Sequence, residues 1–548
     1  MVDYNKSEKN FEILFFKVYR NKYLNHKIYT HLSLFREYRK IELNLDPIEI
    51  LKYREYFSYI QEIKYNGTLE LPLSRFSFPI LKTIEIGRFS KTPPENISYL
   101  TSIDPASVPN SVDTIIFPLD EDINVTCLRN FPDSIKTFKN VKFLNQNDYY
   151  IPSGVTSLTF NSTIGFWNIK DFFPPTLTFL DLGLAWAYTS VIGILPQSMK
   201  TLKVRTQIYD ESIFPSSLTD LTMSQVPKLI GLYPKNLKKL SIISTVHSDL
   251  NLNSLNGLNS LEILELDTNS LLLEINSVPQ SVTILNIKTA SFHNLYRDML
   301  PKSLKSLKIN VYVDSFRIIS LPVGLLELNC ISSGLKDLDV GLLPESLTSL
   351  CLGKKKNKGF NKPIKDGYLP NYLKSLDFGE FNQQINYLPH SLVNLNFGEF
   401  FNKQIIPNSL PSNVEKIVFS PLFNQKLLLN SLPLKLVHLE FGNNFNNQIP
   451  VDILPQSLKT LIFGNRFNQL FLPGSLPSSI SKLIIGNKGS ITASCFNNPI
   501  NENVLPQTLK HFELNCPRYS HPINESFLPS SLRIFIVSDN IIKNDRVF

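Results

Sequence analysis

The chain has 548 residues, of which 43% are hydrophobic, so it can bury a large core, yet it is longer than one compact core usually organises. Its 55 basic and 47 acidic residues give a formal net charge of +8. Spread over this length, that charge is a mild bias and not the concentrated basic face expected of a nucleic-acid binder. Two architectures are left, namely several domains or one elongated array of repeats.

The N-terminal region has no signal-peptide core, because Lys17, Arg20 and Lys22 interrupt its apolar residues. No run of about 18 apolar residues occurs, so we expect no membrane span and a cytoplasmic location. The five cysteines cannot all pair, and no Cys-x-x-Cys spacing occurs. We therefore expect no disulfide framework, no metal site and no cofactor.

Apolar residues spaced three to five apart over residues 11–40 predict one or two short amphipathic helices. A further helix is predicted to begin at Asp46, which suits the N-cap, with Pro47 at the first helical position. We expect residues 1–56 to form a helical cap over the first open coil of an array. The alternative is an adaptor, such as an F-box-like segment that recruits a ubiquitin-ligase core, although the Leu-Pro-rich opening of that motif is missing.

A short motif recurs along the rest of the chain. Its clearest copy, from Leu454 to Phe467, reads Leu-Pro-Gln-Ser-Leu-Lys-Thr-Leu-Ile-Phe-Gly-Asn-Arg-Phe. Successive Leu-Pro pairs lie roughly 20 residues apart, which leaves no room for a pair of helices and fits one short strand per coil. The repeats are degenerate over 57–107, divergent over 108–342 and most regular over 343–537, followed by a tail at 538–548.

Strand geometry assigns a direction to each residue of this copy. Leu461 and Phe463 are expected to point into the stack, while Thr460 and Ile462 point outward. Gly464 suits the turn that leaves the strand. Since one coil cannot bury its apolar face alone and stacked coils can, we predict a mainly β repeat solenoid, with a curved parallel sheet of about 20 coils.

Several coils carry a Phe-Asn pair after the Leu-Pro-x-Ser-Leu segment, as at Phe381-Asn382, Phe401-Asn402, Phe445-Asn446 and Phe496-Asn497. These residues resemble the FNIP repeat, a relative of leucine-rich repeats that is abundant in social amoebae. The resemblance implies a leucine-rich-repeat-like solenoid between about residues 343 and 530. The asparagine lies two residues beyond its usual ladder position, and we hypothesise a buried hydrogen-bonding ladder formed by Asn382, Asn402, Asn424, Asn446 and Asn468.

The sequence contains only isolated fragments of known enzyme motifs. The triplet at Asp377 spells the metal-binding Asp-Phe-Gly of protein kinases, but it lies in repeat register and the other kinase motifs do not accompany it. His438 beside Glu440, and His511 beside Glu513, place an acid near a base without a nucleophile motif. We therefore expect no enzymatic activity and no catalytic residues.

The outward strand positions are the best candidates for binding, because in horseshoe folds they form the concave face. Earlier coils present charges that are expected to satisfy one another, among them Glu265, Asp267, Lys288 and Lys308. Later coils present aliphatic residues flanked by charges. The candidate partner-binding residues are Val418, His438, Glu440, Ile462, Lys482, Ile484, Ile534 and Ile536. The alternative is that the aliphatic residues are ordinary surface strand formers.

A lysine cluster formed by Lys354, Lys355, Lys356 and Lys358 is a candidate anion-binding loop, with a solvated insertion as the alternative. Taken together, the sequence predicts a monomeric, non-catalytic scaffold that binds a protein through the concave face of the solenoid. The alternative is a substrate receptor of a ubiquitin ligase, docked through the N-terminal helices. Nucleic acid is not an expected partner.

Overall fold

The computed structural model forms two compact units, unit 1 (Met1–Lys239) and unit 2 (Leu240–Phe548). The residues that it describes are 31, 34–35, 37–44, 47–66, 77–86, 108–119, 128, 131–141, 150–161, 172–183, 195–204, 214–223, 233–244, 250–255, 257–312, 317–331, 338–353, 360–487, 494–537 and 540–541. None of the helices within those ranges has the length and apolar character needed to span a bilayer.

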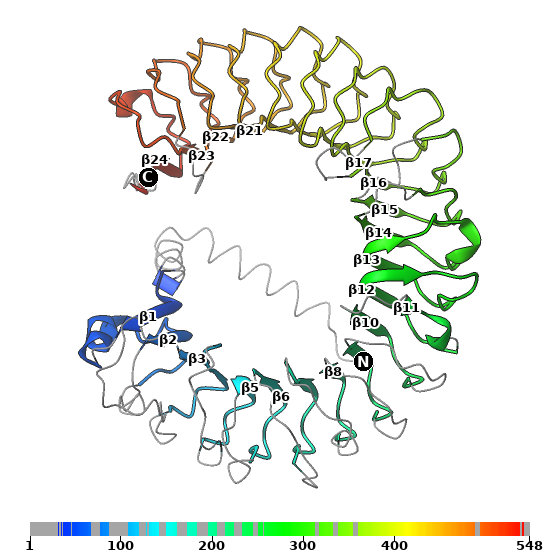
Figure 1. Ribbon diagram of the computed structural model, residues 1–548. Coiled ribbons are helices and arrows are strands. Elements are labelled where there is room, and N and C mark those ends of the chain that lie inside the picture. The colour runs from blue at the N-terminus through cyan, green and yellow to red at the C-terminus, as the bar shows by residue number, and fades with distance from the viewer. Residues whose placement is uncertain are drawn as a thin grey trace, which may run out of the picture. The chain divides into compact units, whose positions relative to one another are not determined.

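Unit 1 is a series of short parallel strands (Figure 1). They are β1 (Lys40–Asn44), β2 (Glu62–Asn66), β3 (Thr83–Ile86), β4 (Thr114–Ile116), β5 (Thr137–Val141), β6 (Ser157–Phe160), β7 (Phe179–Asp181), β8 (Thr201–Val204) and β9 (Asp220–Met223). The 3-10 helix η1 (Pro47–Tyr56) follows β1. Each strand hydrogen-bonds in parallel to the next, as in the pairing of β1 with β2.

Strand β1 lies inside the segment 1–56 that the sequence predicts to be a helical cap, and the sequence analysis did not anticipate it. Its alternating residues bury Ile41 and Leu43, while Glu42 on the other face pairs with Lys64 of β2. The described residues between 31 and 38 are helical, and η1 begins at Pro47 as predicted, but as a 3-10 helix. Residues 11–30 of the predicted helices and the predicted N-cap at Asp46 lie outside the described residues.

Unit 2 continues the same design, with strands on one side of each coil and loops on the other (Figure 1). Its strands are β10 (Lys239–Ser244), β11 (Leu250–Asn251), β12 (Ile263–Leu272), β13 (Ile284–Phe292), β14 (Ser306–Val311), β15 (Glu327–Cys330), β16 (Ser349–Cys351), β17 (Ser375–Asp377), β18 (Asn394–Asn396), β19 (Lys416–Val418), β20 (His438–Glu440), β21 (Thr460–Phe463), β22 (Lys482–Ile485), β23 (His511–Leu514), β24 (Ile534–Val537) and β25 (Asn540–Ile541). Short 3-10 helices lie at η7 (Asn253–Leu255), η8 (Arg297–Met299) and η10 (Glu525–Phe527). The strands pair in parallel except β25, which is antiparallel to β24.

The Leu-Pro-x-Ser-Leu motif builds the turn that enters each strand. In the clearest copy, the N–H of Leu458 donates to the carbonyl oxygen of Pro455 at 3.1 Å and closes the turn. The hydroxyl of Ser457 donates to the carbonyl oxygen of Leu436, in the preceding coil, at 2.6 Å. Equivalent serines repeat this bond at Ser391, Ser479 and Ser531. The motif therefore joins each coil to the preceding one by a hydrogen bond.

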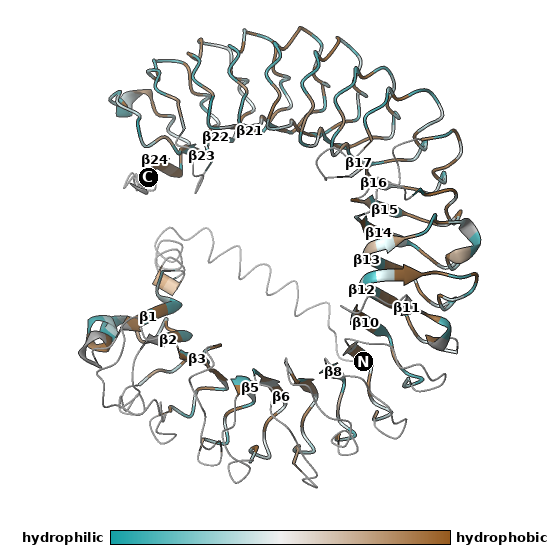
Figure 2. Ribbon diagram, in the orientation of Figure 1, coloured by the Kyte–Doolittle hydropathy of each residue, from teal (hydrophilic) through white to brown (hydrophobic). Residues whose placement is uncertain are grey.

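The predicted alternation in β21 is confirmed. Leu461 and Phe463 are fully buried, whereas Thr460 and Ile462 are partly exposed. Two cysteines on neighbouring strands show the same alternation, since Cys330 is buried and Cys351 is partly exposed. Figure 2 shows the corresponding mixture of hydrophobic and hydrophilic residues along each coil. Stacking brings the apolar residues of successive coils into one continuous core.

Phenylalanine rings fill the core of unit 2 on the side away from the strands. Ring centroids are 6.3 Å apart between Phe381 and Phe401, 6.2 Å between Phe401 and Phe423, and 6.1 Å between Phe423 and Phe445. Neighbouring strands in a sheet are only about 4.8 Å apart. Because the coils lie further apart at the rings than at the strands, this stack curves with its strands on the concave side (Figure 1).

An asparagine ladder runs outside the phenylalanine column. The side-chain oxygen of Asn382 accepts the backbone N–H of Asn402, and the oxygen of Asn402 accepts the N–H of Asn424, each at 2.9 Å. The pattern continues through Asn446 and Asn468. The hydrogen-bonding ladder is thus confirmed, but its predicted burial is wrong, because these side chains are partly or largely exposed. The phenylalanine rings occupy the interior, which leaves the asparagines at its edge.

Glycine follows the strand where successive coils approach most closely. A Cβ on Gly464 would lie 2.4 Å from the carbonyl oxygen of Gly442, and one on Gly442 would lie 1.9 Å from that of Ser420. Neither of these glycines has a positive φ. The sequence analysis assigned Gly464 to a turn, whereas the structure shows that glycine is needed there because a side chain would collide with the neighbouring backbone.

Candidate interaction surface on the exposed strand face

Each strand from β17 to β24 presents two outward positions, and the parallel register aligns them into two rows. The first outward row consists of Ser375, Asn394, Lys416, His438, Thr460, Lys482, His511 and Ile534. The second outward row consists of Asp377, Asn396, Val418, Glu440, Ile462, Ile484, Glu513 and Ile536. All the candidate partner-binding residues predicted from the sequence lie in these rows.

The strand register shows that acidic residues interrupt the predicted aliphatic strip. Ile462 and Ile484 are direct cross-strand neighbours, so they form one apolar pair. Glu440 lies between Val418 and Ile462, and Glu513 lies between Ile484 and Ile536. Ile534 belongs to the first outward row, where it is 44% exposed. The surface is therefore an isolated aliphatic pair bounded by carboxylates.

Each of those carboxylates lies near a histidine of the same strand, but only Glu513 is hydrogen-bonded to it. The Nε2 atom of His438 lies 3.7 Å from Oε2 of Glu440. The Nε2 atom of His511 hydrogen-bonds to Oε1 of Glu513, whose other oxygen accepts from the side chain of Asn515 at 3.4 Å. Side chains two apart on a strand share one face, which explains both contacts. Glu513 is thereby engaged within the chain, whereas the side chain of Glu440 stays 41% exposed.

A further row of basic residues was missed by the sequence analysis. We call Lys459, Lys510 and Arg533, together with the intervening Ser481, the leading row, because each directly precedes the first outward row. Backbone bonds of 2.9 Å join Ser481 to Lys459, Lys510 to Ser481 and Arg533 to Lys510. The three basic side chains are exposed. Their constant place after the Ser-Leu of the motif, or its variants, is the signal that could have revealed them.

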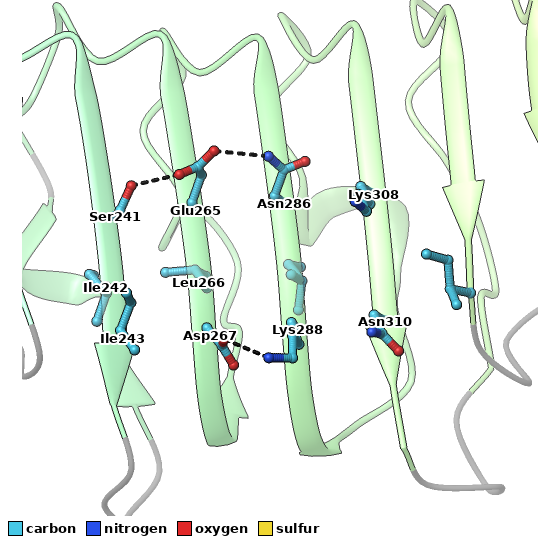
Figure 3. A pocket seen from close by; sticks show the side chains of 12 residues that line it. Ser241, Ile242, Ile243, Glu265, Leu266, Asp267, Asn286, Lys288, Lys308 and Asn310 are labelled. Carbon is cyan, nitrogen blue, oxygen red and sulfur yellow. Dashed lines mark hydrogen bonds and ion pairs between the residues drawn. The ribbon is translucent and has the colours of Figure 1, made fainter. Parts of the chain in front are cut away.

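A second candidate surface is an open depression of about 350 Å³ on the outward face of β10, β12, β13 and β14 (Figure 3). Glu265 accepts hydrogen bonds from Ser241 at 2.7 Å and from Asn286 at 3.3 Å. Asp267 and Lys288 form an ion pair at 2.7 Å. As expected from the sequence, opposite charges on neighbouring strands satisfy one another here, so this surface offers a partner few uncommitted charges.

The remaining sequence-based candidates are not tested by the structure. The anion-binding loop of Lys354, Lys355, Lys356 and Lys358 lies outside the described residues. So do residues 1–30, which carry most of the adaptor hypothesis. Within the described ranges, no group of His, Cys, Asp and Glu side chains is assembled as a metal-ligand set.

Comparison with known families identifies the repeats. Residues 360–400, 401–444 and 445–488 match the family model of the FNIP repeat. The chain contains FNIP repeats. The Phe and Asn that characterise these FNIP repeats are the stacked rings and the ladder residues described above, including Phe401, Asn402, Phe445 and Asn446. The Phe and Asn of the FNIP signature therefore hold neighbouring coils together.

A curated protein with FNIP repeats is similar in sequence to part of this chain. A FNIP repeat-containing protein of Dictyostelium discoideum is 31% identical over 246 residues, which are 38% of this chain and 66% of that protein. The match thus spans just under two thirds of the relative's own length.

Solved structures resemble the FNIP-containing chain in fold. CroV588, described as a novel circular LRR protein structure, is similar with a TM-score of 0.57 at 25% identity, covering 90% of this chain and 88% of that one. The mouse RP105/MD-1 complex gives a TM-score of 0.52 at 14% identity, covering 81% of this chain and 78% of that one. These likenesses confirm the predicted leucine-rich-repeat-like solenoid.

Proposed function

We propose that this FNIP-repeat chain is a non-catalytic scaffold that binds a protein partner through the outward rows of strands β17–β24. The observation that carries the proposal is the adjacency of Ile462 and Ile484 on the concave side of the stack. Both side chains remain partly exposed. An aliphatic pair surrounded by polar groups resembles the centre of an interface, where a partner's apolar residue excludes water and the polar rim sets specificity.

The surroundings of this pair support the same conclusion. Glu440 and Glu513 bound the pair on either side, and Glu513 is hydrogen-bonded to His511. A partner can therefore cover the two isoleucines without leaving Glu513 as an isolated charge in a dry interface, which would be costly, while the more exposed Glu440 belongs to the polar rim. The depression around Glu265 is less suited to a partner, because most of its charges already interact with each other.

The test is affinity purification of the full-length chain from its native cells, with proteins identified by mass spectrometry. We expect Ile462→Asp combined with Ile484→Asp to abolish recovery of the partner while the solenoid stays folded, because both side chains point outward. The matched control is Leu428→Asp combined with Val451→Asp, which adds the same charges at exposed aliphatic positions on the loop side of the coils. Equal recovery with both double variants would remove the outward rows as the binding surface.

A further inference from the structure

The exposed residues on β21–β24 and directly before these strands form a cationic lane and an aliphatic lane. The cationic lane combines the leading row with the first outward row and contains Lys459, Lys482, Lys510 and Arg533. The aliphatic lane is the second outward row, with Ile462, Ile484 and Ile536. Lys482 lies two residues before Ile484, about 7 Å along the strand. The leading row lies three residues before the second outward row, about 10 Å along the chain, so the two lanes follow parallel courses across the coils.

The cationic lane carries charge that the chain itself does not neutralise. Among the described residues, the side chains of Lys459, Lys482, Lys510 and Arg533 make no ion pair or hydrogen bond, and none of the four is adjacent to an unengaged carboxylate on these strands. Glu513 is the one acid in the same rows of β21–β24, and it is held by His511. The lane therefore presents uncompensated positive charge beside an aliphatic surface, and electrostatic complementarity selects a partner with the opposite sign.

We propose, on the basis of the function proposed above, that the partner contributes an acidic segment whose carboxylates face the cationic lane and whose aliphatic side chains cover Ile462 and Ile484. Four strands at about 4.8 Å spacing span roughly 14 Å. About ten residues of α-helix cover that length. The occupant is thus a short acidic amphipathic segment of a protein.

The aliphatic lane favours a protein over a nucleic acid. A phosphate backbone laid along the cationic lane has no aliphatic groups to cover Ile462 and Ile484. Sites that take single strands without sequence preference combine a basic groove with aromatic side chains on which bases stack. On this surface the apolar residues are aliphatic, which suits leucine or isoleucine side chains instead.

The test uses a fluorescein-labelled peptide of about twelve residues with Glu and Leu arranged on opposite faces of a helix. Binding to the full chain is followed by fluorescence anisotropy. We expect Lys482→Glu combined with Lys510→Glu to weaken binding at least about tenfold, since two favourable charge contacts become repulsive. The matched control is Lys403→Glu combined with Lys426→Glu, which makes the same charge change at exposed positions in the loops after β18 and β19 and should leave binding unchanged.

Reversing the charge of the peptide shows whether the Lys→Glu substitutions act through charge or through a general effect on the fold. The peptide with Lys in place of Glu should bind the Lys482→Glu and Lys510→Glu variant more tightly than it binds the unaltered chain. The proposal is overturned if both double variants bind the acidic peptide equally, or if the swapped pair shows no gain. An oligothymidylate of equal charge provides a further comparison. If it binds as tightly as the acidic peptide and its binding is unchanged in the Ile462→Ser variant, the proposal is also overturned. The cationic lane would then bind polyanions in general.

The two proposals fail separately. If the native partner is lost with the isoleucine double variant but kept with Lys482→Glu and Lys510→Glu, the scaffold function stands and the acidic segment is wrong. If the native partner is kept with both variants, the scaffold function itself is wrong for this surface.

Discussion

The side-chain oxygen of Asn446 accepts the backbone N–H of Asn468, one coil further along, at 2.8 Å. The same oxygen accepts a second bond from Nε2 of Gln469 at 3.0 Å. One amide group therefore fixes both the backbone and a side chain of the next coil. The Asn that characterises the repeat acts between coils, and its role can be tested at a single position.

Replacing Asn446 with Ala should destabilise the chain by about 1 kcal/mol, because the N–H of Asn468 loses its acceptor but stays near water. Asn446→Asp keeps the acceptor oxygens and should lose less. Urea unfolding gives the free energy, and hydrogen exchange at the Asn468 amide gives the local effect. Unchanged exchange at Asn468 in the Ala variant would show that the ladder bond does not protect this amide.

Gly442→Ala should destabilise the chain by about 3 kcal/mol or more, because the new Cβ would overlap the backbone of the preceding coil, which cannot move freely. The control is Gly324→Ala, where the nearest atom is Nζ of the flexible Lys305 side chain at 3.3 Å. Neither glycine has a positive φ, so the comparison isolates the collision. Thermal unfolding of the two variants should differ clearly, and equal midpoints would rule out close backbone approach as the reason for Gly442.

Phe445 is fully buried, with Phe423 on one side and Phe467 on the other. Truncation to Ala should cost about 3 to 5 kcal/mol through lost burial and the cavity left behind, whereas Leu should recover much of this. Because each coil contacts only its neighbours, hydrogen exchange should increase most in the coils on either side. Uniform loss of protection along unit 2 would contradict this nearest-neighbour stacking.

Burial raises the pKa of the Cys516 thiol from its ordinary value of 9.0 to about 11. The folded state therefore disfavours the thiolate, and stability that is present below pH 9 should fall as the pH rises toward 11. Cys516→Ala should remove this part of the alkaline decline. The Cys516 thiol also donates to Oγ of Ser494 at 3.0 Å, so the two proteins are compared by their change with pH and not by absolute stability.

The same site makes a prediction for chemical labelling. Cys495 is exposed and Cys516 is buried. At neutral pH, iodoacetamide should modify Cys495 in the folded chain and reach Cys516 only after unfolding, because the thiolate is the reactive species. Peptide mass spectrometry distinguishes the two residues. Rapid labelling of Cys516 in the folded chain would contradict its protected environment.

Within a strand, the sequence correctly predicts which side chains are buried and which face outward. The directions of Thr460, Leu461, Ile462 and Phe463 follow from a period of two that any strand imposes. That alternation does not hold at Lys459, which precedes β21 and is exposed like its neighbour. The basic leading row was not predicted for this reason, because a strict alternation does not allow two consecutive exposed residues.

Other features depend on distances between coils, which a sequence does not contain. The ladder partners of Asn446 were predicted from their spacing, but whether the ladder lies inside or outside the phenylalanine column depends on how the loop folds. Strand β1 carries no Leu-Pro signal before it, and its residues adjoin helical spacing, so the pattern favoured a cap. The isolation of Ile462 and Ile484 became clear only when the register placed Glu440 and Glu513 beside them.

The contacts made by Ser457, Gly464, Phe467 and Asn468 all join fixed positions of the repeat in adjacent coils. Removing one complete coil and rejoining the chain at the same point of the motif would restore each of them between new neighbours. Deleting a few residues would break all of them at once. Genes for such chains can therefore lengthen or shorten by whole turns, and each such event moves outward residues on either side by one strand spacing of about 4.8 Å.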